Sequence, residues 1–157
     1  MNVKFALSAL GLAAAAVLGA PTLASAQTAP DYSYVGVGGT EEGFAINGKV
    51  SLSDNLSVRP AVSTDFDFND GDDVDYVLPV TYDFDAIDAR GRLYPFLGAG
   101  ITGELGEDST IDVAVTGGAD YRITERWLVN GSVVWSPFED DGDSEDVGFV
   151  AGVGYSF

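Results

Sequence analysis

The sequence predicts an all-β fold, an eight-stranded antiparallel up-and-down transmembrane β-barrel, on the strength of three observations. Large apolar residues alternate with small or polar ones over most of the chain, which is the period of a β-strand with two different faces. Turn residues divide this pattern into eight segments, and a helical period nowhere persists for ten residues. Charges lie on the face opposite the large apolar residues, as they do in a strand with lipid outside and a narrow lumen inside.

The last segment, Val147–Phe157, shows the alternation most clearly. Its large residues leave only glycine, serine and one valine for the opposite face, whereas a strand of a soluble sandwich would place polar residues there. An apolar face that ends at Phe157 resembles the closing strand of Gram-negative outer-membrane barrels. In those barrels the pattern is the recognition signal for the insertion machinery. We therefore expect Tyr155 and Phe157 to form the assembly signal.

The first 26 residues have the pattern of a cleaved secretory signal peptide. Lys4 provides a positive start, Phe5 to Ala20 is an apolar run, and Ala24-Ser25-Ala26 is a small-residue cleavage site. A transmembrane anchor is the alternative, but the run is shorter than the roughly 20 residues that a spanning helix needs. Residues 27–157 are then the barrel domain, and export leads it to the cell outer membrane.

Eight segments are expected to cross the bilayer, since each reaches the roughly 9–11 residues that a tilted strand needs. The first and fifth have no clear outward face. In chain order the segments are Tyr32–Thr40, Gly43–Ser53, Leu56–Phe68, Val74–Phe84, Leu93–Glu104, Thr110–Ile123, Trp127–Phe138 and Val147–Phe157. Pro79 lies in the middle of the fourth, where we expect a bulge or a carbonyl bound to water.

Charged residues on the inward faces are expected to form ion pairs in the lumen, because a buried charge persists only when it is paired. If Phe68 lies opposite Val74, Arg59 faces Asp83 on the inward side. If Ile123 lies opposite Trp127, Arg122 lies beside Asp120 but across from Leu128. The predicted set of lumenal ion-pairing residues is Lys49, Arg59, Asp83, Asp120 and Arg122.

The composition excludes several functions. The chain has no cysteine and no histidine, so it lacks a thiol nucleophile, the usual general base and the commonest metal ligand. Its serines therefore have no usual base for activation, and we expect no enzymatic activity and no bound cofactor. The formal net charge of -18 at pH 7 excludes nucleic acid as a partner, because its phosphates would be repelled.

The connections between segments fall into two chemical sets. One set carries thirteen carboxylates and no base, in Glu41-Glu42, Asn69–Asp73, Leu105–Ser109 and Glu139–Asp146. The other carries four acids and three arginines, in Asp54-Asn55, Asp85–Arg92 and Thr124–Arg126. An even number of strands places both termini beside the second set, so the acidic set faces outside if the second set faces the periplasm.

The acidic loops suggest a weak site for Ca²⁺ or Mg²⁺, because hard cations prefer oxygen ligands. The residues proposed for it are Glu139, Asp140, Asp141 and Asp143. The alternative is a solvated electrostatic fence without bound metal.

These features together resemble the OmpA-like/OmpX-like outer-membrane β-barrel superfamily. The resemblance lies in the signal peptide, the eight segments, the glycine-rich stretches Tyr34–Gly38 and Phe96–Gly100, and the terminal Phe157. It implies a non-enzymatic integral outer-membrane protein, monomeric, with a structural or surface-interaction role and a lumen plugged by side chains. Its implied partners are outer-membrane lipid, lipopolysaccharide and the barrel-insertion machinery. The alternatives are a narrow passive cation-preferring, porin-like channel and, more distantly, a secreted lipocalin-like carrier.

Overall fold

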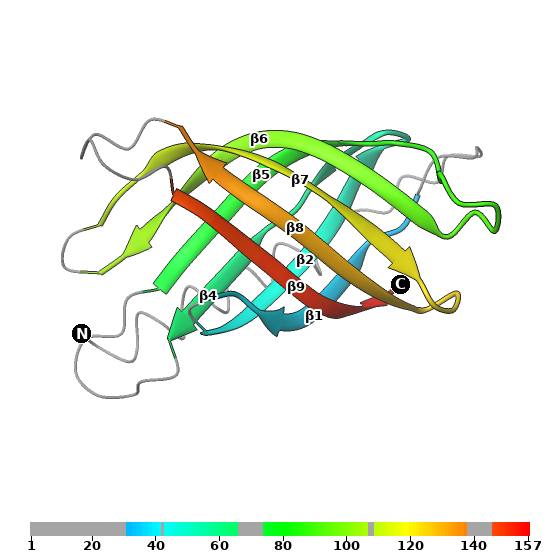
Figure 1. The fold of residues 1–157 in the computed structure, drawn as a ribbon, viewed down its shortest axis with the longest axis horizontal. Coiled ribbons are helices and arrows are strands. Elements are labelled where there is room, and N and C mark those ends of the chain that lie inside the picture. The colour runs from blue at the N-terminus through cyan, green and yellow to red at the C-terminus, as the bar shows by residue number, and fades with distance from the viewer. Residues whose placement is uncertain (1–30, 42, 66–73, 107–108, 138–145) are drawn as a thin grey trace.

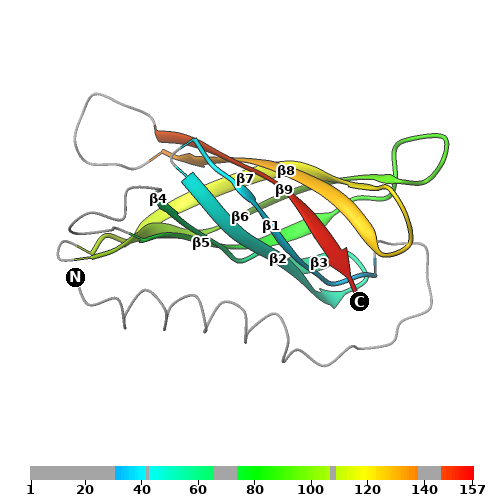
Figure 2. The same ribbon diagram turned by 90° about the horizontal axis from the view of Figure 1, so that it is seen from below.

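The computed structural model describes residues 31–41, 43–65, 74–106, 109–137 and 146–157, and these form one closed antiparallel β-barrel (Figures 1 and 2). Strands that follow one another along the chain pair, except that β3 and β4 both lie between β2 and β5, and β1 also pairs with β9 to close the barrel. None of the described residues belongs to a helix long and apolar enough to span a membrane. The strands are β1 (Tyr34–Gly39), β2 (Gly43–Ser53), β3 (Leu56–Val58), β4 (Ala61–Asp65), β5 (Val74–Asp83), β6 (Leu93–Leu105), β7 (Asp112–Arg122), β8 (Trp127–Ser136) and β9 (Asp146–Ser156).

The eight predicted segments correspond to these nine strands, because β3 and β4 are two halves of one predicted segment. Both halves pair with β2 on one side and with β5 on the other. Arg59 and Pro60 separate them. The predicted signal peptide, residues 1–26, lies outside the described residues.

The predicted register between the third and fourth segments is wrong by four residues. Thr64, and not Phe68, lies opposite Val74. A shift by an even number of residues leaves every side chain on the same face, so the alternation that predicts the faces cannot determine this register. The register between β7 and β8 is as predicted, with Arg122 opposite Leu128.

The irregularity expected at Pro79 lies in the neighbouring strand instead. β5 continues through Pro79, which pairs with Gly100 of β6. The Pro79 carbonyl accepts the Arg59 amide at 3.1 Å, and Arg59 stands at the break between β3 and β4. Proline has no amide hydrogen, so Pro79 cannot donate the return hydrogen bond to Arg59. The ladder is therefore interrupted at Arg59. The bulge in this part of the sheet lies in β2, between Ser51 and Ser53.

The outer surface carries a continuous set of exposed large apolar side chains, including residues of β1 and β6, whose facing the sequence left open. Val37 of β1 is 53% exposed and Leu97 of β6 is 54% exposed. Val50, Val62 and Val74 share this face by their cross-strand partners, as Val74 does with the exposed Leu105, although their own side chains are buried. An apolar surface of this extent in water would promote aggregation, so hydrocarbon is its natural solvent.

The seam between β1 and β9 depends on glycines that face the lumen. Gly38 pairs with Gly152, and Gly36 pairs with Gly154. A Cβ atom on Gly152 would lie 2.7 Å from the Val37 carbonyl oxygen and 3.2 Å from the Gly38 Cα. The small residues of β9 are therefore required by the close approach of the two backbones at the closing seam.

We predict that Gly152→Ala destabilises the barrel by about 1–3 kcal/mol, because the added methyl group overpacks the seam. Gly131→Ala is the matched control, since its Cβ would have 4.0 Å of clearance from the Val150 carbonyl oxygen, the nearest atom. The measurement is the free energy of unfolding in urea, followed by tryptophan fluorescence of the barrel in lipid vesicles. Equal stabilities for the two variants would show that the seam tolerates side chains.

Candidate functional site: the lumen

Four buried charged residues fill the lumen near the end of the barrel that holds the described termini. Lys49 lies on β2, Arg59 at the break between β3 and β4, Asp83 on β5 and Asp120 on β7. Their exposed fractions are 0%, 6%, 2% and 0%. Two cations and two anions balance, which makes their burial tolerable. We call this group the lumenal ion cluster.

Arg59 is the centre of the lumenal ion cluster. Its Nη2 lies 2.9 Å from Asp83 Oδ1 and 2.9 Å from Asp120 Oδ2, and its Nη1 donates to Asp120 Oδ1 at 3.1 Å. Arg59 and Asp120 thus form a two-point contact, the strongest arrangement for a guanidinium and a carboxylate. Lys49 Nζ completes the cluster at 3.1 Å from Asp83 Oδ2.

The pair between Arg59 and Asp83 forms even though the two residues are not cross-strand neighbours. The backbone of Arg59 faces Pro79, four residues before Asp83. The long arginine side chain covers this offset along the lumen, and its Nε donates to Thr81 Oγ1 at 3.2 Å on the way. Thr81 Oγ1 is also 2.8 Å from Ser57 Oγ. The pair that the sequence predicted from direct cross-strand pairing therefore forms through the length of the arginine side chain.

Aromatic rings cover the lumenal ion cluster. Tyr32 donates its hydroxyl to Asp120 Oδ2 at 2.7 Å, and Lys49 Nζ lies 4.0 Å from the centre of the same ring. The guanidinium carbon of Arg59 lies 3.6 Å from the centre of the Phe96 ring. Cation–π contacts of this kind stabilise cations that have lost their water. Sequence reasoning missed Tyr32 and Phe96 because both belong to the segments whose facing was ambiguous.

Arg122 does not join the lumenal ion cluster as predicted. Its Nη2 donates to the Glu125 carbonyl at 2.6 Å, and its guanidinium lies 5.0 Å from the Tyr32 ring centre. Within the described part of the chain, no salt bridge links it to Asp120. Arg59 donates to both oxygens of Asp120, and Tyr32 donates to one of them. Arg122 therefore lies outside the lumenal ion cluster.

A second layer crosses the middle of the lumen. The side-chain amides of Asn47 on β2 and Asn130 on β8 donate to each other at 3.2 Å and 3.3 Å. Both residues are buried, at 5% and 6% exposure. A cavity of about 30 Å³, room for about one water molecule, lies beside this pair.

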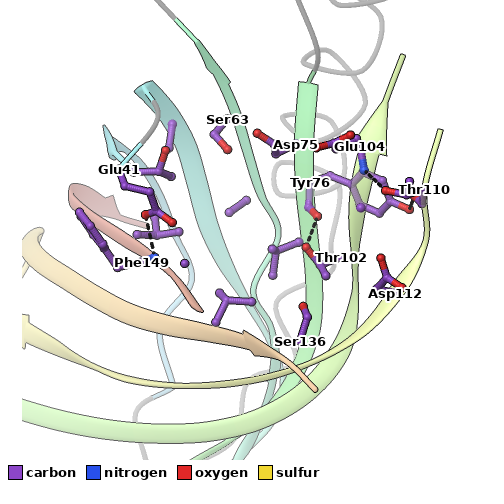
Figure 3. A pocket seen from close by; sticks show the side chains of 18 residues that line it. Glu41, Ser63, Asp75, Tyr76, Thr102, Glu104, Thr110, Asp112, Ser136 and Phe149 are labelled. Atoms are coloured by element: carbon purple, nitrogen blue, oxygen red, sulfur yellow. Dashed lines mark hydrogen bonds between the residues drawn. The ribbon is translucent and has the colours of Figure 1, made fainter. Parts of the chain in front are cut away.

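The opposite end of the lumen is open and acidic (Figure 3). A cavity of about 140 Å³, large enough for several water molecules, is lined there by residues that include Glu41, Asp75, Glu104 and Asp112. Asp75 lies directly opposite Glu104 across β5 and β6. The Glu41 carboxylate accepts the Phe149 amide at 2.9 Å, which ties the β1–β2 connection to β9 (Figure 3). We call this cavity the acidic vestibule.

The predicted metal site cannot be placed on this structure. Glu139, Asp140, Asp141 and Asp143 lie outside the described residues. In the ranges that the structure does describe, three or more acidic, histidine or cysteine side chains nowhere come together in a way that could hold a metal ion. The weak divalent-cation site stays a prediction.

The turn between β5 and β6, at the end that holds the termini, is organised by Asp88. Its carboxylate accepts the amides of Leu93 at 2.7 Å and of Arg90 at 3.2 Å. These backbone hydrogen bonds hold the pKa of the Asp88 carboxyl below its usual range, and the hydrogen bond from Leu93 has the largest effect. The carboxyl group is nevertheless in contact with solvent. Gly91 follows with a φ of 65°, a conformation that favours glycine.

Comparison with known proteins identifies the fold. The first domain of Pseudomonas aeruginosa OprF, an N-terminal β-barrel, superposes with a TM-score of 0.58 at 16% identity, covering 80% of this chain and 97% of that one. The outer-membrane protein Ail of Yersinia pestis, determined in a phospholipid bilayer nanodisc, gives 0.55 at 14% identity over 80% and 99%. The chain has the eight-stranded outer-membrane β-barrel fold. Outer-membrane protein AlkL, determined in lipid bilayers, also matches, with a TM-score of 0.52 at 17% identity over 88% of this chain and 95% of that one.

Sequence comparison adds a partial match to this barrel. The family described as the YadA-like membrane anchor domain matches residues 112–157, which contain β7, β8 and β9. No curated protein matches the chain by sequence. The apolar outer surface and the shared fold together locate the barrel in the outer membrane.

We predict that Arg59→Ala and Asp83→Ala each destabilise the barrel by roughly 3–5 kcal/mol, since each leaves a buried charge without its partner. The double variant should cost less than the sum of the two. Arg122→Ala is the control, because its guanidinium lies outside the lumenal ion cluster and its loss should change stability by less than about 1 kcal/mol. The measurement is the free energy of unfolding in a double-mutant cycle. Strictly additive losses would contradict the pairing of Arg59 with Asp83.

Proposed function

We propose that the protein is a non-enzymatic, monomeric integral outer-membrane β-barrel with a structural or surface-interaction role and a lumen closed by its own side chains. The observation that carries this proposal is the lumenal ion cluster, in which Arg59 joins Asp83 to Asp120 across the barrel. Asp120 comes from β7 and Arg59 from the break between β3 and β4, so the contact spans the lumen rather than following its wall.

The order of layers along the lumen supports closure. The acidic vestibule and the small cavity beside Asn47 and Asn130 share Val77 and Val134 in their linings, and Arg59 of the lumenal ion cluster lines the small cavity. A solute that crossed would have to separate both layers. Separating buried, paired charges without replacing their partners costs several kcal/mol per ion, which opposes passage.

The chemistry of the lumen supports a role other than catalysis. The buried hydroxyl groups of Ser57 and Thr81 are engaged with each other, and the carboxylate of Asp83 is held by two cations. A general base needs a free proton acceptor within reach of the nucleophile. In the described lumen the candidate acceptors beside Ser57 and Thr81 are committed to ion pairs.

The acidic vestibule supports a role at the surface. Under the expected orientation, this vestibule and the acidic loops face outside, so the barrel presents negative charge to its surroundings. Such a surface attracts cations and cationic molecules and repels the phosphates of lipopolysaccharide unless divalent cations lie between them. We include outer-membrane lipid, lipopolysaccharide and the barrel-insertion machinery among the proposed partners.

Conductance across a planar lipid bilayer tests closure. We predict that the refolded barrel inserts without stepwise current increases, because the lumenal ion cluster blocks the path. The Arg59→Ala/Asp83→Ala double variant should show small openings, whereas Asp112→Asn, which alters only the acidic vestibule, should stay silent.

Reproducible, cation-selective steps from the unaltered protein would contradict closure and support the alternative of a narrow, cation-preferring channel. Insertion must be verified in every recording by heat-modifiable migration of the same preparation on a gel, so that silence reports a closed barrel and not a missing one.

A further inference from the structure

Exposed aromatic rings and two arginine side chains, Arg126 exposed and Arg92 half-buried, meet at the end of the barrel that holds the described termini. Tyr121, Trp127 and Tyr155 are 37%, 51% and 37% exposed. The guanidinium carbon of Arg92 lies 5.1 Å from the Tyr121 ring centre, and Arg126 Nη1 donates to the Tyr155 hydroxyl at 3.2 Å. We call these five residues the arginine–aromatic rim.

The rim is continuous over neighbouring strands. Trp127 of β8 lies directly opposite Tyr155 of β9, and their rings meet edge to face at 5.3 Å. Tyr121 lies on the adjacent strand β7, opposite Val129 of β8. The three rings thus border the apolar outer surface at the level where the strands enter their turns, the position of interfacial aromatic residues in membrane barrels.

The backbone around both arginines is held in place. The Thr124 hydroxyl oxygen accepts the amides of Arg126 at 3.2 Å and of Trp127 at 3.0 Å. On the other side of the rim, the Asp88 carboxylate accepts the amides of Arg92 and Leu93. The guanidinium groups are therefore presented from ordered turns, which lowers the entropic cost of binding a ligand.

No salt bridge links a carboxylate to the rim among the described residues. The salt bridges found among the described residues all lie in the lumen and involve neither Arg92 nor Arg126. Asp88, the carboxylate next to Arg92, is occupied by backbone amides. Arg92 Nε is buried and has no hydrogen-bond acceptor anywhere in the described part of the chain. The guanidinium groups of the rim are thus not committed to carboxylates among the described residues.

We propose that the arginine–aromatic rim binds the phosphate groups of anionic phospholipids in the leaflet that surrounds this end of the barrel. Guanidinium groups pair with phosphate oxygens, and the tyrosine and tryptophan rings suit the boundary between headgroups and hydrocarbon. The opposite end of the barrel carries the acidic vestibule, so the two ends differ in the headgroups that they attract. This inference rests on the proposed function only in requiring that the barrel is integral to a membrane.

The two tryptophans allow a direct test, because Trp127 belongs to the rim and Trp135 lies toward the other end of the same strand, β8. In Trp135→Phe, the remaining reporter is Trp127; in Trp127→Phe, it is Trp135. Each variant is placed in vesicles of phosphatidylcholine and phosphatidylglycerol, with bromine on the acyl chains of one lipid at a time to quench nearby fluorescence.

We predict that Trp127 reports a relative association constant for phosphatidylglycerol about fivefold above that for phosphatidylcholine, while Trp135 reports no preference. In the Trp135→Phe background, Arg92→Gln with Arg126→Gln should abolish the preference. Arg90→Gln is the matched control from the same turn as Arg92, because in the described structure Arg90 stacks on neither tyrosine of the rim. It should keep the preference.

Equal quenching of Trp127 by both lipids would overturn the inference, as would a preference that survives the double arginine variant. Inorganic phosphate, compared with chloride at the same ionic strength, separates a lipid headgroup from a free anion. Loss of the preference in phosphate alone would show a soluble-anion site and overturn the lipid assignment. Absence of quenching by either lipid would show that the barrel is outside the bilayer, which would overturn the proposed function itself.

Discussion

The structure depends on the need to pair charges in a lumen too narrow for them to keep their water. Arg59 meets this need by binding Asp83 and Asp120 at once, and Lys49 satisfies the remaining oxygen of Asp83. Two surrounding features support this contact. The break beside Pro60 holds Arg59, and the rings of Tyr32 and Phe96 replace water around Lys49 and Arg59. Loss of Arg59 leaves Asp120 without a cation, and loss of Asp83 leaves Lys49 without an anion.

The two ends of the barrel have opposite chemistry, and this difference has a physical basis in the chain. The connections at the end with the termini hold ordered turns, as in the β5–β6 connection, where Asp88 accepts three amide hydrogen bonds. The other end opens into the acidic vestibule, where Asp75 and Glu104 stand opposite each other. An acidic face outside and an arginine–aromatic rim at the other end would give the barrel a defined direction in its membrane.

The faces of the strands could be predicted from the sequence, but their register could not. A period of two assigns Arg59 and Asp83 to the lumen whatever the register, and a shift by four residues leaves that assignment unchanged. The pair between Arg59 and Asp83 forms although the predicted register is wrong, because the long arginine side chain spans the four-residue offset. Arg59 with Asp120 was not predicted, because the two residues lie on strands that are not neighbours. Cross-strand arithmetic reaches adjacent strands only, so contacts across the lumen require three-dimensional information.

The protonation and solvent exchange of the Arg59 side chain test the central claim most directly. In nitrogen-15 NMR spectra of the barrel in bilayer nanodiscs, the account predicts that the Arg59 side-chain N–H protons exchange slowly with water and shift when Asp120→Asn is introduced. The exposed side chain of Arg90, in the turn between β5 and β6, serves as the internal reference for fast exchange. Arg59 protons that exchange as fast as those of Arg90 would show a hydrated lumen and contradict the account.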